Sequence, residues 1–190
     1  MPVKPTTLSF AVLLSVAVVL AAKPSLAQDK GKTKAAELTS QSQAALGKLT
    51  ATAPLAKALA PTAHAILIFP KITKAGLGIG GQYGEGTLFK AGKAVAYYKT
   101  TGASFGLQAG GQQYGYAMFF MNEKAVAQLD NAQGFEVGVG PSIVVADEGM
   151  AKTTTTNTIK EDIVAFVFGQ KGLMAGLGIQ GNKITKITPK

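Results

Sequence analysis

One serine stands in the pattern that hydrolases use for their nucleophile. Residues 102–106 match G-x-S-x-G and carry Ser104 at the centre. The nucleophile elbow needs a helix after the serine, and then an acid and a histidine in that chain order. The only histidine, His64, precedes Ser104, and an alternating pattern typical of a strand follows the serine. The sequence therefore predicts a strand serine here and no hydrolase.

A second glycine pattern is that of a nucleotide-binding loop. Residues 76–81 match G-x-G-x-x-G, a fingerprint that must follow a strand and open a helix. Here Leu77 and Ile79 alternate with glycines, and this period of two is typical of a strand. We expect no nucleotide at this position.

Metal chemistry has few candidate ligands. One histidine and no cysteine do not make a zinc site of the usual kind. The acidic pairs Asp147/Glu148 and Glu161/Asp162 are adjacent residues, which point to opposite faces of a strand. Turn or capping roles therefore fit them better than calcium binding. We predict a protein that is not an enzyme and holds no metal and no cofactor.

The N-terminus has the pattern of a secretory signal peptide. Residues 8–22 form an apolar run without charge, and Ser25 and Ala27 are the small residues at positions −3 and −1 of a cleavage site. We expect residues 1–27 to be removed and residues 28–190 to form one domain in the periplasm or outside the cell. No cysteine follows the apolar run, so no lipid anchor is expected.

The elements that must position any site are helical at first and then extended. Residues 29–52 predict a helix and residues 55–60 a shorter one. The face of the long helix consists of Leu38, Ser42, Ala45 and Leu49, and it is only weakly apolar.

From residue 64 onward short strands alternate with glycine turns. We expect Pro70 to close a buried strand and residues 84–86 and 91–92 to form turns in an antiparallel meander. Asn122 predicts the N-cap of one internal helix over residues 123–130. The other expected features are strands at 135–139, 142–146, 163–168 and 183–187, a turn at 147–149 and an edge strand at 153–156.

Two glycine segments echo each other. Residues 75–82 and residues 175–182 both alternate leucine and isoleucine with glycine. A row of glycines removes one face of side chains and suggests close approach by another layer or a bend. The predicted fold class is α+β: a mainly antiparallel, glycine-rich sheet, sandwich- or barrel-like, with helices over residues 28–60, strands over most of 64–190 and one internal helix.

Five collinear motifs resemble one family. They lie at residues 68–76, 82–86, 102–108, 145–149 and 168–176, in the order found in the SYLF-domain (YSC84-like) family. The resemblance spans roughly residues 35–187 and favours the bacterial exported branch. It implies a lipid-binding module, since eukaryotic relatives bind phosphoinositides and some associate with actin. We carry neither ligand over, because an exported chain is not expected to meet actin or phosphoinositides.

The charge balance supports an anionic partner independently. Without residues 1–27 the chain has 17 basic and 10 acidic residues, a net charge of +7, and every basic residue is lysine. The absence of arginine disfavours nucleic acid, because lysine lacks the planar bidentate fork that reads base edges. An anionic phospholipid surface remains the predicted partner. The candidate contact residues are Lys71, Lys74, Lys171, Lys183 and Lys186, which share one rim if the two glycine segments are neighbours, with Lys30, Lys32 and Lys34 as the alternative contact.

A second function class stays open at this point. A glycine-rich β protein without ligand chemistry would serve as a structural element of the cell envelope, or as a small outer-membrane barrel. Against a barrel, the sequence ends in Lys190 and a helix interrupts the strands.

Overall fold

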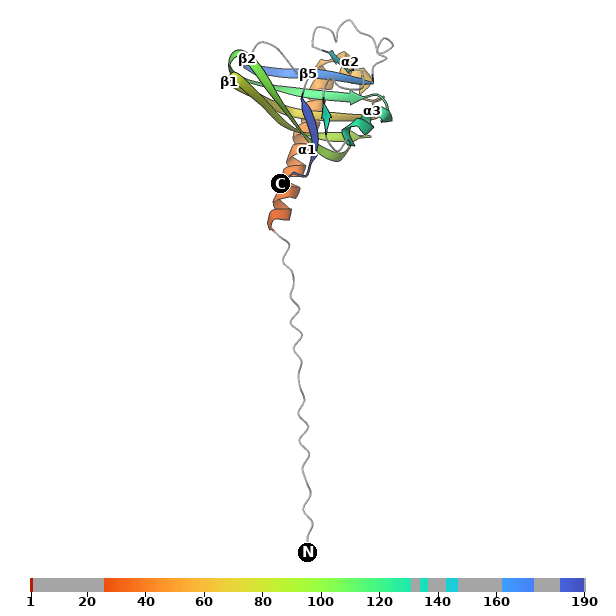
Figure 1. Ribbon diagram of the computed structural model, residues 1–190. Coiled ribbons are helices and arrows are strands. Elements are labelled where there is room, and N and C mark those ends of the chain that lie inside the picture. The colour runs from red at the N-terminus through yellow and green to blue at the C-terminus, as the bar shows by residue number, and fades with distance from the viewer. Residues whose placement is uncertain (2–25, 131–133, 137–142, 147–161, 173–181, 190) are drawn as a thin grey trace.

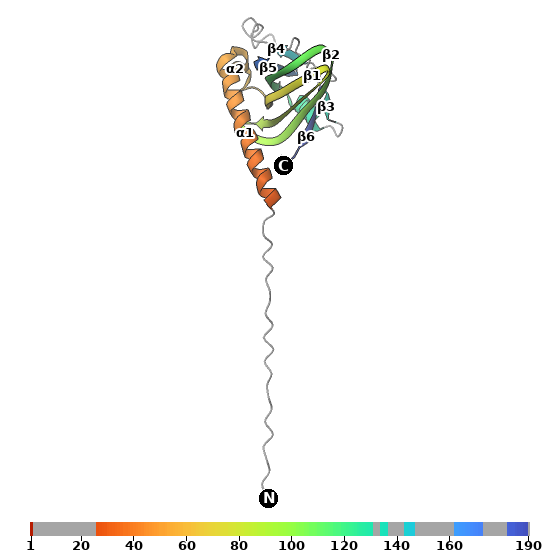
Figure 2. The same cartoon turned by 90° about the vertical axis from the view of Figure 1, so that its left-hand side faces the viewer.

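A long helix lies along one face of a bent β-sheet (Figure 1), and the same arrangement is seen from the side in Figure 2. The computed structural model describes residue 1 and residues 26–130, 134–136, 143–146, 162–172 and 182–189. The expected signal peptide lies almost wholly outside these residues. So do the predicted turn at 147–149, the predicted edge strand at 153–156 and most of the second glycine segment.

The fold is of the predicted α+β class. The elements are α1 (Leu26–Thr52), α2 (Pro54–Leu59), β1 (Ala65–Lys90), β2 (Lys93–Phe120), α3 (Glu123–Ala127) with the 3₁₀ turn η1 (Gln128–Asp130), β3 (Phe135–Glu136), β4 (Ile143–Ala146), β5 (Ile163–Gly172) and β6 (Lys183–Ile187). The open sheet has the order β3-β6-β2-β5-β4, with β1 beside β2. Its pairings are antiparallel except that of β4 with β5, which is parallel.

Helix α1 buries the face that the sequence predicts. Its buried positions are Leu38, Ser42, Ala45, Leu49. Two hydrogen bonds between hydroxyl groups connect this weakly apolar face to the sheet. The Ser42 hydroxyl donates to Oγ1 of Thr87 over 3.1 Å, and the hydroxyl oxygens of Thr39 and Tyr97 lie 2.9 Å apart. The helix begins at Leu26, so the predicted cleavage site lies within its first turn.

The expected meander of short strands is wrong for residues 65–120. These residues form one long hairpin, β1 and β2, closed by the predicted turn at Ala91 and Gly92, which both have positive φ. Pro70 does not end a strand, because a register shift between Phe69 and Ile72 accommodates it. Residues 84–86 do not form the predicted turn either, because they lie inside β1 and pair in regular register with residues 98–100 of β2.

Glycines in β1 let the strand approach its own first half. A Cβ atom on Gly86 would lie 2.3 Å from the carbonyl oxygen of Ile68, and one on Gly84 would lie 2.8 Å from Cγ1 of Ile72. These two glycines therefore serve close packing and not the turn that was predicted. The close approach expected for the glycine segments 75–82 and 175–182 concerns other residues, and the surroundings of Gly78 and Gly178 lie outside what the structure describes.

Apolar side chains gather on both faces of the sheet. The outer face, covered by α1 and α2, buries Ile68, Phe119 and Phe166 against those helices. The inner face carries the larger cluster, which includes Leu67, Tyr116, Met118, Ile163, Ala165 and Ile184 and is closed by Ala125, Val126 and Leu129 of α3 and η1. The side chain of Asn122 accepts the backbone N–H of Ala125, so the predicted N-cap is confirmed.

Strand β2 is the centre of the sheet. Its first half pairs with β6 and its second half with β5, while β1 runs along its other edge. The predicted strand at residues 183–187 is β6 itself. The ends of the two glycine segments also meet, since the side-chain amide of Gln82 donates to Oδ1 of Asn182.

Candidate functional site: a lysine-lined groove beside α1

A groove of about 500 Å³ runs between α1 and the outer face of the sheet. Three lysines from three elements line it: Lys48 from α1, Lys71 from β1 and Lys171 from β5. All three are exposed. The groove thus gathers cationic groups that are far apart in the sequence, and we refer to it as the lysine groove.

The register of the sheet explains why the lysines of β1 and β5 lie close together. Thr73 of β1 lies opposite Gln113 of β2, which in turn lies opposite Lys171 of β5. Lys71 falls in the register shift next to Pro70, where the strand locally departs from regular pairing. Gln113 and Lys171 line the groove together with Lys71.

The floor of the groove is apolar and depends on a glycine. Ala44, Ala45, Pro70 and Phe168 contribute to its lining. The ring of Phe168 lies where a side chain at residue 115 would be, because a Cβ atom on Gly115 would come within 2.3 Å of that ring. Gly115 therefore allows the phenylalanine to cover β2 and to form the bottom of the groove.

The charge of the groove has one sign. No carboxylate is among the described residues that line it, and none of its three lysines forms a salt bridge with a described residue. The nearest acidic group along α1 is Glu37, which accepts a 3.0 Å hydrogen bond from Nε2 of Gln41 at one end of the groove. Three exposed ammonium groups around an apolar floor favour a ligand with an anionic head and an apolar body.

Residues 101–188 match the family model of Ysc84, described as Las17-binding protein actin regulator. The match supports the resemblance noted in the sequence for this part of the chain, and this Ysc84/SYLF family is associated with lipid binding. No curated protein is significantly similar to the chain. The match begins within β2 and ends just past β6, so it contains Gln113 and Lys171, whereas Lys48 and Lys71 precede it.

The predicted lysine contacts do not share one rim. Lys71 and Lys171 meet at the lysine groove. Lys74 is only 4% exposed and lies on the inner face, two residues after Ile72 of the inner cluster. Lys183 and Lys186 are on β6, where Lys186 forms a 3.7 Å salt bridge with Asp130.

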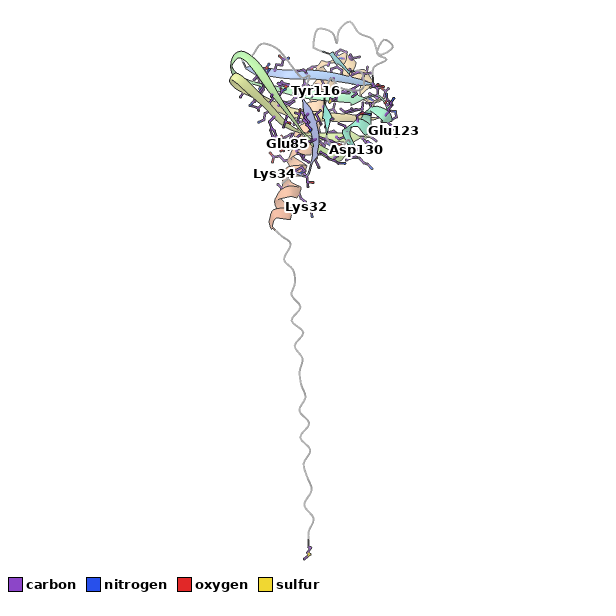
Figure 3. All side chains as sticks on the ribbon, in the orientation of Figure 1. Lys32, Lys34, Glu85, Tyr116, Glu123 and Asp130 are labelled. Carbon is purple, nitrogen blue, oxygen red and sulfur yellow. The ribbon has the colours of Figure 1, made fainter. Side chains whose placement is uncertain are left out.

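The alternative contact, at the start of α1, is separate from the groove. This part of the helix extends beyond the sheet (Figure 2), and Lys32 and Lys34 lie on it, away from the sheet (Figure 3). Both are exposed, and residues 31–37 contain no large apolar side chain. Contact through this segment would therefore be electrostatic without insertion of an apolar face. Lys30 belongs to the same helix, but its side chain is not described.

Two residues that line the groove, Lys48 and Gln113, were not predicted from the sequence. Lys48 follows the buried Ala45 by three positions, so helical spacing alone places it beside the sheet-facing side of α1. Gln113 is the exposed neighbour of the buried Gln112, which period-two alternation indicates. Both signals were present in the sequence, but only the packing of α1 on the sheet joins them.

The patterns that suggested enzymes have structural roles. Residues 76–81 lie inside β1, and Ser104 lies in β2 with no helix after it. His64 is exposed before β1, and its backbone N–H donates to the Phe120 oxygen over 2.8 Å. Asp162 accepts a 2.7 Å hydrogen bond from the Asn122 side chain, which ties the α3 cap to β5.

Among the described helices, none is long and apolar enough to cross a membrane.

Proposed function

We propose that the protein binds anionic phospholipid surfaces peripherally, with Lys48, Lys71 and Lys171 as the main contacts. The observation that carries the proposal is the convergence of these exposed lysines around one groove that has an apolar floor and no described carboxylate in its lining. Lipid association of the Ysc84/SYLF family gives further support. The family description names Las17 binding and actin regulation, which we do not transfer to a chain that we propose is exported.

The expected affinity is moderate. A lysine near an anionic membrane contributes about 1 kcal/mol, so three of them give about 3 kcal/mol, or roughly a hundredfold preference for anionic over neutral vesicles. This part of the binding is screened by salt, because the Debye length falls from about 10 Å at 0.1 M to about 3 Å at 1 M ionic strength.

Co-sedimentation with vesicles of defined charge tests the proposal. Changing the three groove lysines to glutamine is expected to remove most binding to anionic vesicles. The matched control changes Lys57, Lys90 and Lys124 to glutamine, which removes the same charge from three exposed lysines that do not line the groove, and it is expected to bind nearly as the parent does. Equal binding to neutral vesicles, or binding that high salt does not weaken, would contradict the mechanism.

A separate pair of variants decides between the two lysine clusters. Changing Lys32 and Lys34 to glutamine removes charge from the projecting end of α1 and leaves the groove intact. If this change abolishes binding while the groove variant retains it, the contact lies at the start of α1. If neither change reduces binding, the contact lies outside both clusters, whereas failure of the parent to bind anionic vesicles would favour the alternative of a structural envelope protein without a lipid ligand.

We also propose export, with cleavage after Ala27 and location in the periplasm or outside the cell. The charge and apolar pattern of residues 1–27 supports this proposal. The intact mass of the protein recovered from the periplasmic fraction tests it, and a mature chain that starts at Gln28 is the expected result. A membrane-bound form that keeps Met1 would refute it.

A further inference from the structure

A second groove, of about 550 Å³, lies along the other flank of α1. Helical spacing places residues 43, 46, 47 and 50, which line it, on one side of the helix, whereas residues 41, 44 and 48 line the lysine groove on the other side. Its remaining walls come from the segment after α2, from the outer face of β1 and from the turn between β1 and β2. We refer to it as the apolar groove, and the membrane contact proposed above does not use it.

The lining of the apolar groove offers little to a polar ligand. No charged residue is among the described residues that line it. Ile66 and Phe89 are buried and belong to the outer core cluster, against which Leu46 packs. The hydroxyl of Thr50 is engaged within the helix, since it donates to the carbonyl oxygen of Leu46 over 3.0 Å, and the other polar side chain of the lining, Gln43, is exposed. A polar ligand would lose hydration here without compensation, so the groove suits an apolar one.

A glycine keeps the rim of the groove open. Gly47 lies in the interior of α1, where glycine is the least favourable residue after proline. A Cβ atom on Gly47 would meet nothing within 4 Å, so close packing does not require glycine at this position. The missing side chain leaves the groove accessible from the exposed side of the helix.

The two grooves together are complementary to an amphiphilic surface. Lys48, which lines the lysine groove, directly follows Gly47, which lines the apolar groove. The exposed ridge of α1 between the grooves consists of small residues, Ser40, Gly47 and Ala51. A surface that reaches Lys48 therefore also comes close to the apolar groove. An anionic bilayer offers both matching parts, since its head groups are attracted by lysine and its acyl chains are uncharged.

We propose that the apolar groove holds one acyl chain of a membrane phospholipid. The proposal rests on the function proposed above, because the groove lysines are what bring the bilayer to this side of α1. Moving a chain from the bilayer into the groove exchanges one apolar environment for another, and the gain comes from groove wall that is removed from water. A monomeric lipid dissolved in water gains more, because its chain is removed from water as well.

Titration with monomeric lysophosphatidylcholine isolates this site from the lysine groove. The head group of this lipid has no net charge, and the full mature chain is titrated by calorimetry below the concentration at which the lipid forms micelles. Affinity should rise about fourfold with each added methylene, as expected for burial of a CH₂ group, and should level off once the chain fills the groove. High salt should not weaken this binding, in contrast to vesicle binding through the lysines.

Two substitutions of Gly47 separate filling of the groove from stabilisation of the helix. Gly47→Ala and Gly47→Leu both introduce a strong helix former into open space, so both proteins should melt at or above the temperature of the parent. Gly47→Leu also places a large side chain at the rim and should weaken lysolipid binding by about tenfold or more. Gly47→Ala should bind much more nearly like the parent. Ala51→Leu, at an exposed residue of α1 that lines neither groove, is the matched control and should bind as the parent does.

Failure of the acyl-chain site differs from failure of the membrane proposal. A parent that sediments with anionic vesicles but binds no lysolipid would overturn the site and leave the membrane proposal standing. So would a Gly47→Leu protein that is folded and binds lysolipid as tightly as the parent. A parent that binds lysolipid but no anionic vesicles would instead refute the membrane proposal, because the groove would then hold a chain without lysines that bring a bilayer to it.

Sedimentation velocity without lipid tests the other occupant, a second copy of the chain. We expect the parent and Gly47→Leu to have the same oligomeric state. A dimeric parent that becomes monomeric on Gly47→Leu substitution would assign the apolar groove to a protein interface and overturn the proposal.

Discussion

Replacing Gly86 by alanine tests whether β1 packs against its own first half. The added Cβ atom would lie 2.3 Å from the carbonyl oxygen of Ile68 and 2.7 Å from Cδ1 of Phe69. The first neighbour is backbone and does not rotate away. The clash therefore has to be relieved by moving one half of the hairpin against the other.

The expected cost is the balance of two terms. Overpacking of a buried position costs about 1–3 kcal/mol, and a backbone neighbour favours the upper part of that range. Alanine also restricts the unfolded chain and returns about 0.4–1 kcal/mol. The free energy of unfolding should therefore fall by about 2 kcal/mol, which lowers the melting temperature of a chain of this length by roughly 4–8 °C.

Gly81→Ala is the matched control in the same strand. Its Cβ atom would meet only the Gly102 oxygen, at 3.9 Å, which is an ordinary contact. This variant should equal or exceed the parent in stability, by up to about 1 kcal/mol. Thermal unfolding followed by circular dichroism measures both. A Gly86→Ala protein as stable as the parent, or two variants that lose the same amount, would refute the packing argument.

Three further predictions concern single groups. Asn122→Ala removes the acceptor for the Ala125 N–H and should lower stability by about 1 kcal/mol in urea unfolding, whereas an unchanged midpoint would show that the cap is redundant. Ser42→Ala leaves the buried Thr87 hydroxyl without its donor and should cost about 1–2 kcal/mol, while Thr52→Ala on the exposed side of α1 should cost much less. Burial raises the pKa of Tyr114 to about 12, above its usual value of 10, so its stabilising contribution is complete below pH 10 and is lost as the pH rises through 12; alkaline unfolding together with tyrosinate absorbance checks this.

The helical part of the fold follows from local pattern. Leu38, Ser42, Ala45 and Leu49 repeat at helical spacing, and the structure buries all four. The β6 strand and the Asn122 cap were predicted at their observed positions for the same reason: each depends on a few neighbouring residues.

The long hairpin could not be predicted in this way. The local sequence around Gly84 and Gly86 looks the same whether these glycines form a turn or leave room for a closely packed neighbour. The neighbour is Ile68 or Ile72, a dozen or more residues earlier, and only the folded strand brings it there. The local sequence therefore predicted a turn, whereas close tertiary packing is the reason that these positions are glycine.

The candidate site could be predicted from the sequence only in part. Lys71 and Lys74 are three residues apart, and such residues point to opposite faces of a regular strand. This spacing already argued against a shared rim, and the structure places them on opposite faces. The position of Lys48 beside Lys171 could not be predicted, because it depends on how α1 crosses the sheet.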